Sequence, residues 1–287
     1  TQGTDIRRAV RNFREAHPEF AHVAVVPVNT PDYVGCLESG YALAVEALIE
    51  TLVPESSCVG RRPRQVNVLA SGMLTPGDIE AIKEWVEAFG LRPVFLPDVS
   101  GSLDGHIPEQ WLGTTIGGTP LAALQELGGA VHTLAIGEQM RPTAEALQAR
   151  CGVPYTLFDR LTGLTATDAL VQQLATLSGR PVPARVRRQR SQLVDAMLDG
   201  HFHFGNKKVA LAAGSQLPAG SATGARASST LRASAAAGSG SSRPALIASR
   251  VPYQSCGIGP PPNCTVTPAR AVNCSWMIHV VRLCRLN

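Results

Sequence analysis

One cysteine stands at a corner where an α/β fold can place chemistry. An apolar run over 23–28 ends at a turn-forming segment over 29–32, and Cys36 then opens a helical pattern. A thiolate at such a corner can ligate a metal or an iron–sulfur cluster or act as a nucleophile, provided that its pKa is lowered. Asp32 is the second candidate residue of this corner. The default interpretation of Cys36 is a small residue packed at the start of a helix, because no basic group or second cysteine is adjacent in the sequence.

Other polar clusters give weaker chemical signals. Asp98, Asp104 and His106 border a glycine-rich loop and could bind a metal or transfer protons, although such residues more often cap turns. His201 and His203 could chelate a metal, but a His-x-His pair at an interdomain turn is usually structural. These residues are therefore not assigned to a site.

The remaining motifs argue against several kinds of site. No Gly-x-Gly-x-x-Gly, Walker or Gly-x-Ser-x-Gly motif occurs, so nucleotide binding by the standard devices is unsupported. Cys58 and Cys151 have no neighbouring His or Cys that would indicate ligation. The four arginines between 185 and 190 lack interleaved aromatic residues, which makes them a weak nucleic-acid signal and favours a solvated or interface face.

Strand and helix patterns alternate along the chain and must position these residues. Cap-plus-proline helix starts occur at Thr75-Pro76 and Thr119-Pro120. The alternation predicts an α/β fold with Rossmann-like parallel sheets flanked by helices, including a four-stranded unit over about 62–160. We expect ligands at the carboxyl ends of its strands. The predicted helices cover 5–16, 37–52, 76–89, 141–150, 165–177 and 183–198, and the predicted strands cover 23–28, 66–70, 94–96, 131–136, 153–158 and 208–212.

Charge is distributed unevenly along the 287 residues. Residues 1–213 carry 19 basic and 22 acidic side chains, whereas residues 214–287 carry seven arginines and no Asp, Glu or Lys. The regularly patterned part is mildly acidic, so the net charge of +4 gives no reason to expect a nucleic-acid partner. No apolar run of about 18 residues occurs and no leader is visible at Thr1, so we expect no membrane span and a cytoplasmic protein.

The composition changes abruptly after Ala213. A Gly/Ala/Ser/Arg/Pro mixture without periodicity follows, which indicates either a disordered tail or translation of a GC-rich gene in a shifted frame. The expected domains are the end of a first α/β domain with its N-terminal part missing (1–60), a second α/β domain with closing helices (61–204), the start of a truncated third domain (205–213), and a disordered or out-of-frame tail (214–287).

Over residues 1 to about 213, the chain resembles the nitrogenase component-1 superfamily. The resemblance is carried by VPVNTPDYVGCLESGYALAVEALIETLVP, RPRQVNVLASGMLTPGDIEAIKEWVEAFGLRPVFLPDVSGSLDGH and SGRPVPARVRRQRSQLVDAMLDGHFHFGNKKVALAA. Within the superfamily the chain is most similar to the β-like subunit of the scaffold that builds the iron–molybdenum cofactor, because LTPGDIE and PDVSGSLDGH favour that subunit over nitrogenase itself. Tyr33 and Cys36 stand where the nitrogenase β subunit has Phe and Ser.

The resemblance implies three α/β domains per subunit and an α2β2-type heterotetramer with an α-like scaffold subunit. The nitrogenase iron protein is the second implied partner. The implied cofactors are a [4Fe–4S] cluster shared with the α-like partner and a precursor of the iron–molybdenum cofactor, held mainly by that partner. The β-like subunit's own cluster cysteine lies in an N-terminal part of the family chain that is absent here, so no established ligand is carried over.

The corner over 30–36 resembles the one that approaches the interfacial cluster in nitrogenase. Asp32 and Cys36 are therefore assigned to cofactor binding by proximity alone. No metal ligand and no catalytic residue is assigned. If another subunit or a further domain covers these surfaces, the corner over 29–36 and the arginines over 185–190 should be largely exposed in the isolated chain.

Three functions from different classes remain open. The chain can be a cofactor-assembly scaffold subunit without catalytic residues, a β subunit of nitrogenase or of a related iron–sulfur reductase, or an unrelated Rossmann-like protein that binds a small ligand. A scaffold carries iron–sulfur clusters without reducing dinitrogen, and a small-ligand binder carries no iron. Metal content and activity therefore separate the three.

The composition break predicts where a protease cuts first. Residues 214–287 should form no cooperative core with residues 1–213, because a short apolar segment without a patterned partner cannot offset about 1–2 kcal/mol of backbone entropy per ordered residue. Limited proteolysis should cleave just after Ala213 and leave a stable fragment of the first 213 residues. Protection of the tail equal to that of residues 62–160 would contradict the prediction.

Overall fold

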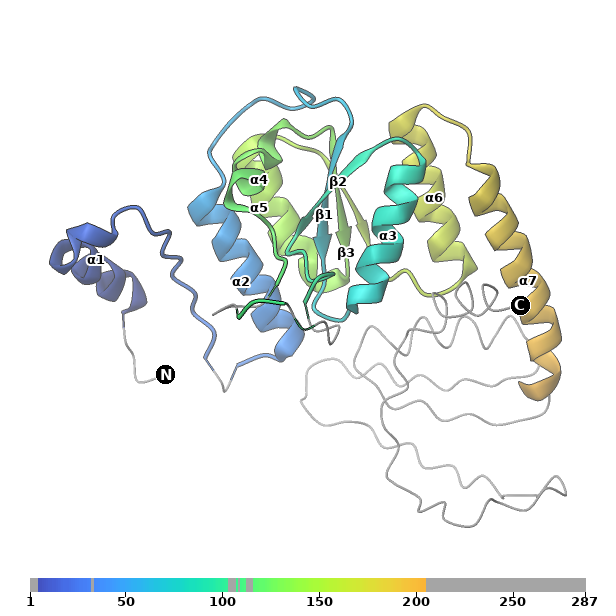
Figure 1. Ribbon diagram of the computed structural model, residues 1–287, viewed down its shortest axis with the longest axis horizontal. Helices are drawn as coiled ribbons and strands as arrows, with labels where there is room; N and C mark the ends of the chain where they lie inside the picture. The colour runs from blue at the N-terminus through green and yellow to red at the C-terminus, as the bar shows by residue number, and fades with distance from the viewer. Residues whose placement is uncertain (1–4, 32–33, 103–106, 108, 112–115, 205–287) are drawn as a thin grey trace, which may run out of the picture. The chain divides into compact units, whose positions relative to one another are not determined.

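The computed structural model describes residues 5–31, 34–102, 107, 109–111 and 116–204. Helices and strands alternate along this part of the chain (Figure 1). The predicted strand over 208–212 and the predicted tail lie outside the described residues. The elements in chain order are α1 (Ile6–Ala16), the 3-10 helix η1 (Pro18–Phe20), α2 (Leu37–Leu52), β1 (Gln65–Ala70), α3 (Pro76–Ala88), β2 (Arg92–Leu96), α4 (Leu121–Gln125), η2 (Leu127–Gly129), β3 (His132–Ile136), η3 (Glu138–Met140), α5 (Arg141–Cys151), β4 (Tyr155–Phe158), α6 (Leu164–Ser178) and α7 (Ala184–Phe204).

Four strands form one parallel sheet in the order β2-β1-β3-β4. The register pairs Val68 of β1 with Phe95 of β2 and with Leu134 of β3. Ala135 of β3 pairs with Leu157 of β4. The predicted parallel sheet is confirmed, and the strand order reverses between β1 and β3, which is where doubly wound sheets open a crevice at their carboxyl edge.

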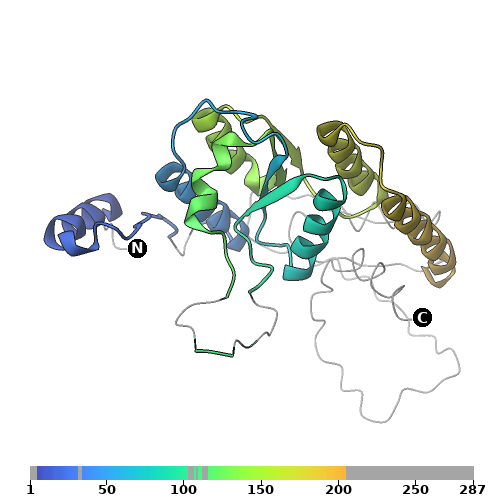
Figure 2. The same cartoon turned by 45° about the horizontal axis from the view of Figure 1, so that its top comes forward.

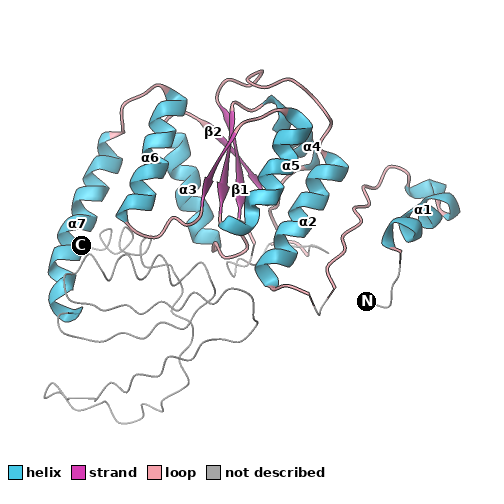
Figure 3. Cartoon of the chain, turned by 180° about the vertical axis from the view of Figure 1, so that it is seen from behind, coloured by secondary structure: helices cyan, strands magenta, loops and turns pink. Residues whose placement is uncertain are grey.

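Helices cover both faces of the sheet. Helices α2, α4 and α5 lie on one face, and α3 and α6 lie on the other (Figures 1 and 2). Seen from behind, the strands stand between these two helical layers (Figure 3). All six residues of the central strand β1 are buried, including the polar residues Gln65 and Asn67, as expected for a parallel strand that is covered on both faces.

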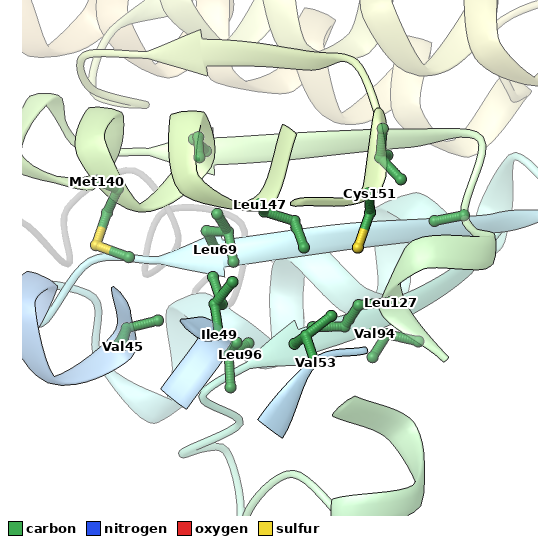
Figure 4. Close-up of a cluster of buried hydrophobic side chains, with 14 of the residues drawn as sticks. Val45, Ile49, Val53, Leu69, Val94, Leu96, Leu127, Met140, Leu147 and Cys151 are labelled. Atoms are coloured by element: carbon green, nitrogen blue, oxygen red, sulfur yellow. The ribbon is translucent and has the colours of Figure 1, made fainter. Parts of the chain in front are cut away.

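One hydrophobic cluster holds α2, α4 and α5 on their face of the sheet (Figure 4). Ile49 of α2, Leu69 of β1 and Leu147 of α5 are fully buried at its centre. Alternate residues of the strands supply this cluster, and the intervening residues supply the opposite face under α3 and α6. The further members of the cluster are Ala42, Val45, Val53, Val94, Leu96, Leu124, Leu127, Ala130, Ala135, Met140, Ala144, Cys151 and Val153.

Buried polar side chains also link the sheet to the short helix before β3. The Asn67 side-chain amide donates to the Leu127 carbonyl at 2.9 Å and to Thr133 Oγ1 at 3.4 Å. Gln65 Nε2 donates to the Glu126 carbonyl at 3.1 Å. These bonds satisfy the buried side-chain N–H donors, which would be costly to leave unpaired, and they fix η2 at the amino edge. The Oε1 atom of Gln65 has no hydrogen-bond partner.

Helix ends follow the sequence signals at most positions. Thr75 caps α3 through a capping box with Asp78, and Pro76 occupies the first turn, as predicted. Gly152 ends α5 with φ 74°, a conformation that favours glycine. The predicted cap at Thr119 is wrong: Pro120 is the N-cap of α4, because the Thr119 hydroxyl donates to the Phe95 carbonyl at 2.7 Å instead.

The predicted strand over 23–28 is also wrong for the described chain. The segment is extended without belonging to any sheet. A strand exists only when a partner satisfies its backbone, and no described segment does so here.

Helix α2 shares one hydrophobic core with the sheet that follows it in the chain. Helix α2, expected in a domain that ends near residue 60, packs against α5 and belongs to the core of the sheet. Two compact units are present: within the described ranges, one comprises 5–160 and 168–183, and the other comprises 161–167 and 184–204. No helix in the described ranges is long and apolar enough to cross a membrane.

Burial within α2 predicts two different mutational costs. Replacing Ile49, which is 0% exposed, with Ala should lower the free energy of unfolding by about 2–5 kcal/mol, because it opens a cavity against β1 and α5. Leu43→Ala in the same helix is the matched control, because Leu43 is 47% exposed and its replacement should cost well under about 1 kcal/mol. Urea unfolding measures both values, and equal losses would contradict this packing.

Candidate functional site at the carboxyl edge of the sheet

Cys36 occupies the N-cap position of α2 and is exposed. Its thiol accepts a hydrogen bond from the Ser39 backbone, while Ser39 Oγ accepts from the Cys36 N–H and donates to the Cys36 carbonyl, each at 2.9 Å. Gly35 precedes the cap in a left-handed backbone conformation, with φ 78°, which favours glycine. A Cβ at this position would also lie 2.3 Å from Ser39 Oγ and would clash with it. The default interpretation of Cys36 as a packed residue is wrong, since the cap leaves its sulfur facing outward.

Hydrogen bonding lowers the pKa of the Cys36 thiol below its usual value. The main cause is the bond from the Ser39 backbone, followed by the bond from the Ser39 side chain. The small burial of the thiol and the negative charge of Glu38 oppose this shift without cancelling it. A helix N-terminus favours an anion, so the corner presents an exposed sulfur that is biased toward its thiolate form.

Neighbouring elements hold the first turns of α2 in place. Tyr41 packs against the loop after β1, where a Cβ on Gly72 would lie 3.0 Å from Tyr41 Cγ. Thr143 Oγ1 of α5 donates to the Ala42 carbonyl at 3.2 Å. Burial raises the pKa of Tyr41 to about 12, so this side chain stays neutral. The corner at Cys36 is therefore fixed to the carboxyl ends of the strands.

A second polar group lies after β2, at the same edge of the sheet. Lys83 Nζ of α3 donates to Asp98 Oδ2 at 2.5 Å and to Ser100 Oγ at 2.6 Å. The Asp98 N–H donates to Thr119 Oγ1 at 3.0 Å. Burial by itself would raise the pKa of Asp98, but the hydrogen bonds from Lys83 and Ser100 outweigh it and lower that pKa. Asp98 thus fixes the base of the loop as an ion pair and turn cap.

The structure does not describe most of the other candidate residues. Asp32, Asp104 and His106 lie outside the described residues, and so do the side chains of His201 and His203. Within the described ranges, no three His, Cys, Asp or Glu residues come close enough to hold a metal ion.

The two remaining described cysteines lie away from this edge. Cys58 is exposed in the loop before β1, and Cys151 is buried with its Sγ 3.4 Å from the Pro54 carbonyl. The arginines over 185–190 are exposed, as predicted. In the described part of the corner, residues 29, 30 and 34–36 are exposed as well, and Pro31 is half-buried.

The sequence analysis did not predict two side chains that contact candidate residues, Ser39 beside Cys36 and Lys83 beside Asp98. Ser39 was detectable, because a serine three residues after a cap residue is the reciprocal half of a capping box. Lys83 was not, because its contact with Asp98 joins an α3 side chain to a loop fifteen positions further along the chain.

The hydrogen bonds of Ser39 to Cys36 predict how fast the Cys36 thiol is alkylated. Ser39→Ala should slow iodoacetamide labelling of Cys36 at pH 7.5 by about two- to tenfold, the range expected for losing one hydrogen bond to the reacting group. Mass spectrometry locates the label, and exposed Cys58 is the internal control whose rate should not change. An unchanged Cys36 rate would show that Ser39 does not stabilise the thiolate.

The chain is similar to a known protein family, to several named relatives and to a solved structure. Residues 1–226 match the family described as "Nitrogenase component 1 type Oxidoreductase", so the match extends past the composition break near Ala213. A solved nitrogenase structure, "Nitrogenase Cp1 at pH 6.5", aligns with a TM-score of 0.65 and 28% identity, covering 72% of this chain and 44% of that one.

Several relatives carry the name "Nitrogenase iron-molybdenum cofactor biosynthesis protein NifN". The proteins from Bradyrhizobium diazoefficiens and Nostoc sp. are each 46% identical, over 214 and 212 residues, and the protein from Klebsiella pneumoniae is 42% identical over 213 residues. Each match covers 74% of this chain and 46–47% of the relative, so the chain spans less than half the length of these proteins. The chain belongs to the nitrogenase component 1 type oxidoreductase family.

Proposed function

We propose that this chain is part of a subunit of the scaffold on which the nitrogenase iron–molybdenum cofactor is assembled. The observation that carries the proposal is its 41–48% identity to relatives named for biosynthesis of that cofactor. In this proposal the chain acts with an α-like partner subunit in an α2β2-type heterotetramer in the cytoplasm, and the nitrogenase iron protein is a second partner. The expected domains, 1–60, 61–204, 205–213 and 214–287, belong to the same proposal.

The described residues do not form a complete iron–sulfur site. A [4Fe–4S] cluster takes four thiolate ligands. Of the three described cysteines, Cys151 is buried against a backbone carbonyl, and no three potential ligands lie together among the described residues. A cluster at this chain would therefore take ligands from beyond the described residues, and in the proposal the α-like partner shares it.

Cys36 is the described residue best suited to face such a shared cluster. Its sulfur is exposed, its pKa is lowered, and the capping box holds it at the carboxyl edge. In the proposal this edge contacts the α-like partner, and that partner holds most of the cofactor precursor. The exposure of the residues around Cys36 supports a covering subunit.

The alternatives are less well supported. A nitrogenase β subunit or a related reductase shares the family and the fold, but several relatives are named for cofactor biosynthesis. A small-ligand binder would keep its site at the strand switch between β1 and β3. Family membership makes that third function the weakest of the three.

Co-expression with the α-like subunit tests the proposal. A tag on that subunit should recover this chain, and the complex should contain iron but reduce no dinitrogen. Recovery with dinitrogen reduction would favour the nitrogenase alternative. An absence of both recovery and iron would refute the scaffold proposal.

Among the described residues, the two exposed cysteines provide a matched pair of variants for the contact surface. Cys36→Arg places a long cation at the carboxyl edge and should reduce recovery by about tenfold or more, as expected for a charge buried without a partner at an interface. Cys58→Arg, in the loop before β1, should leave recovery unchanged. Thermal unfolding of both variants checks that each still folds, and equal recovery would place the partner elsewhere.

A further inference from the structure

Arginine side chains gather at the amino edge of the sheet, at the opposite ends of the strands from Cys36. Arg64 directly precedes β1, and Arg92 is the first residue of β2. The Arg92 N–H donates to the Arg64 carbonyl at 2.7 Å, so the two residues are neighbours where adjacent strands begin. Both are exposed.

Arg180, which follows α6, reaches the same place from a distant part of the chain. Its guanidinium lies against Gly90 in the turn between α3 and β2, where a Cβ would come within 2.1 Å of Arg180 Nη1. Gly90 has φ 76°, so a glycine suits this turn both for its backbone and for the arginine beside it. Gly90 stands two residues before Arg92, and Arg180 is also exposed. We call Arg64, Arg92 and Arg180 the arginine edge.

Within the described ranges, no acidic side chain pairs with the arginine edge. The nearby Glu126 is already paired with Arg62, and none of the other ion pairs includes one of the three arginines. Helices α3 and α6 end at this edge, and a helix C-terminus attracts cations, but each such contact contributes only about 0.3–1 kcal/mol and is screened by salt. That attraction accounts for single arginines and does not require three of them to converge.

The loop that carries Arg64 is held in place on the short helix η2. The Arg62 N–H donates to the Gly129 carbonyl at 2.8 Å, and the Arg62 side chain pairs with Glu126. The Gln65 N–H donates back to the Arg62 carbonyl at 2.9 Å, which closes the turn around Arg64. A charged surface whose backbone is already ordered loses little conformational entropy when it binds a partner.

We propose that the arginine edge binds an acidic segment of another protein. Guanidinium groups pair with carboxylates through two parallel hydrogen bonds, and arginine is enriched at protein interfaces. Charge complementarity therefore specifies a partner surface that is rich in Asp and Glu. The inference goes beyond the contact with the α-like subunit, which is assigned to the carboxyl edge, and does not depend on it.

A nucleic acid fits this edge less well than an acidic protein does. Residues 1–213 carry 19 basic and 22 acidic side chains, so the surrounding chain repels a polyanion of high charge density. The three segments that carry the arginines, 58–65, 90–93 and 178–183, contain no aromatic residue on which a base could stack.

Fluorescence anisotropy with a labelled peptide of about ten glutamates tests this inference on the full chain, at about 50 mM salt to limit screening. The triple variant Arg64→Gln/Arg92→Gln/Arg180→Gln should bind the peptide about tenfold or more weakly than the wild-type chain, because three ion pairs are lost together. The seven arginines of 214–287 are common to both chains, so the difference in affinity reports the arginine edge.

A second triple variant is the matched control. Arg7→Gln/Arg8→Gln/Arg11→Gln removes the same three charges from exposed positions of α1, and its affinity should stay within about twofold of wild type. Thermal unfolding checks that both variants fold. If the first triple variant does not fold, Arg92→Gln and Arg180→Gln are tested singly, and each should weaken binding by about twofold.

Three results would overturn the proposal. Equal weakening by the two triple variants would show that the peptide responds only to net charge. Wild-type affinity in the arginine-edge variant would place the acidic segment elsewhere. Duplex DNA of about 20 base pairs that binds more tightly than the peptide, and that loses more affinity in the arginine-edge variant than in the control, would identify a nucleic-acid surface instead. All these measurements use the chain without the α-like subunit, so the scaffold function is tested separately.

Discussion

The burial of β1 on both faces is the constraint on which the rest of the structure depends. Every residue of this strand is inaccessible to water, and its backbone pairs with β2 on one side and β3 on the other. A strand in that position needs apolar cover above and below, and α2 with α5 on one face and α3 on the other provide it. Because all four strands run parallel, every connection must cross the sheet, and the carboxyl ends gather at one edge.

The site at that edge follows from the same arrangement. Helix α2 packs on β1 through Ile49, and its first turn therefore comes to lie beside the loop after β1, where Tyr41 meets Gly72. The N-terminus of α2 places Cys36 at the edge, and the bonds from Ser39 bias its sulfur toward the thiolate. An exposed sulfur with a lowered pKa, in a first turn whose charged residue is Glu38, suits a shared surface better than a closed active site. The scaffold proposal uses that feature, since a shared cluster needs a face and not a pocket.

Helices α1 and α2 both carry apolar residues that lie outside the hydrophobic cluster of the described sheet. The sheet buries the apolar residues of α3, α5 and the inner side of α2. No described residue pairs with the backbone of 24–28. Within the described ranges, no residue of α1 is buried, and Leu37 and Leu43 of α2 are exposed.

The sequence alone determined α1 to α3 and α5 to α7, the four strands, their parallel direction and the position of Cys36 at a helix start. These features depend on local periodicity and caps, which act over a few residues: Thr75 and Pro76 begin α3, and the β-branched and apolar residues at the end of β1 indicate a buried strand. Tertiary structure decided the rest. The run over 23–28 has every local property of a strand but no partner, and Thr119 has the local signal of a cap but bonds to β2. The Lys83–Asp98 pair and the exposure of Cys36 likewise depend on which elements meet in space, and no local pattern records that.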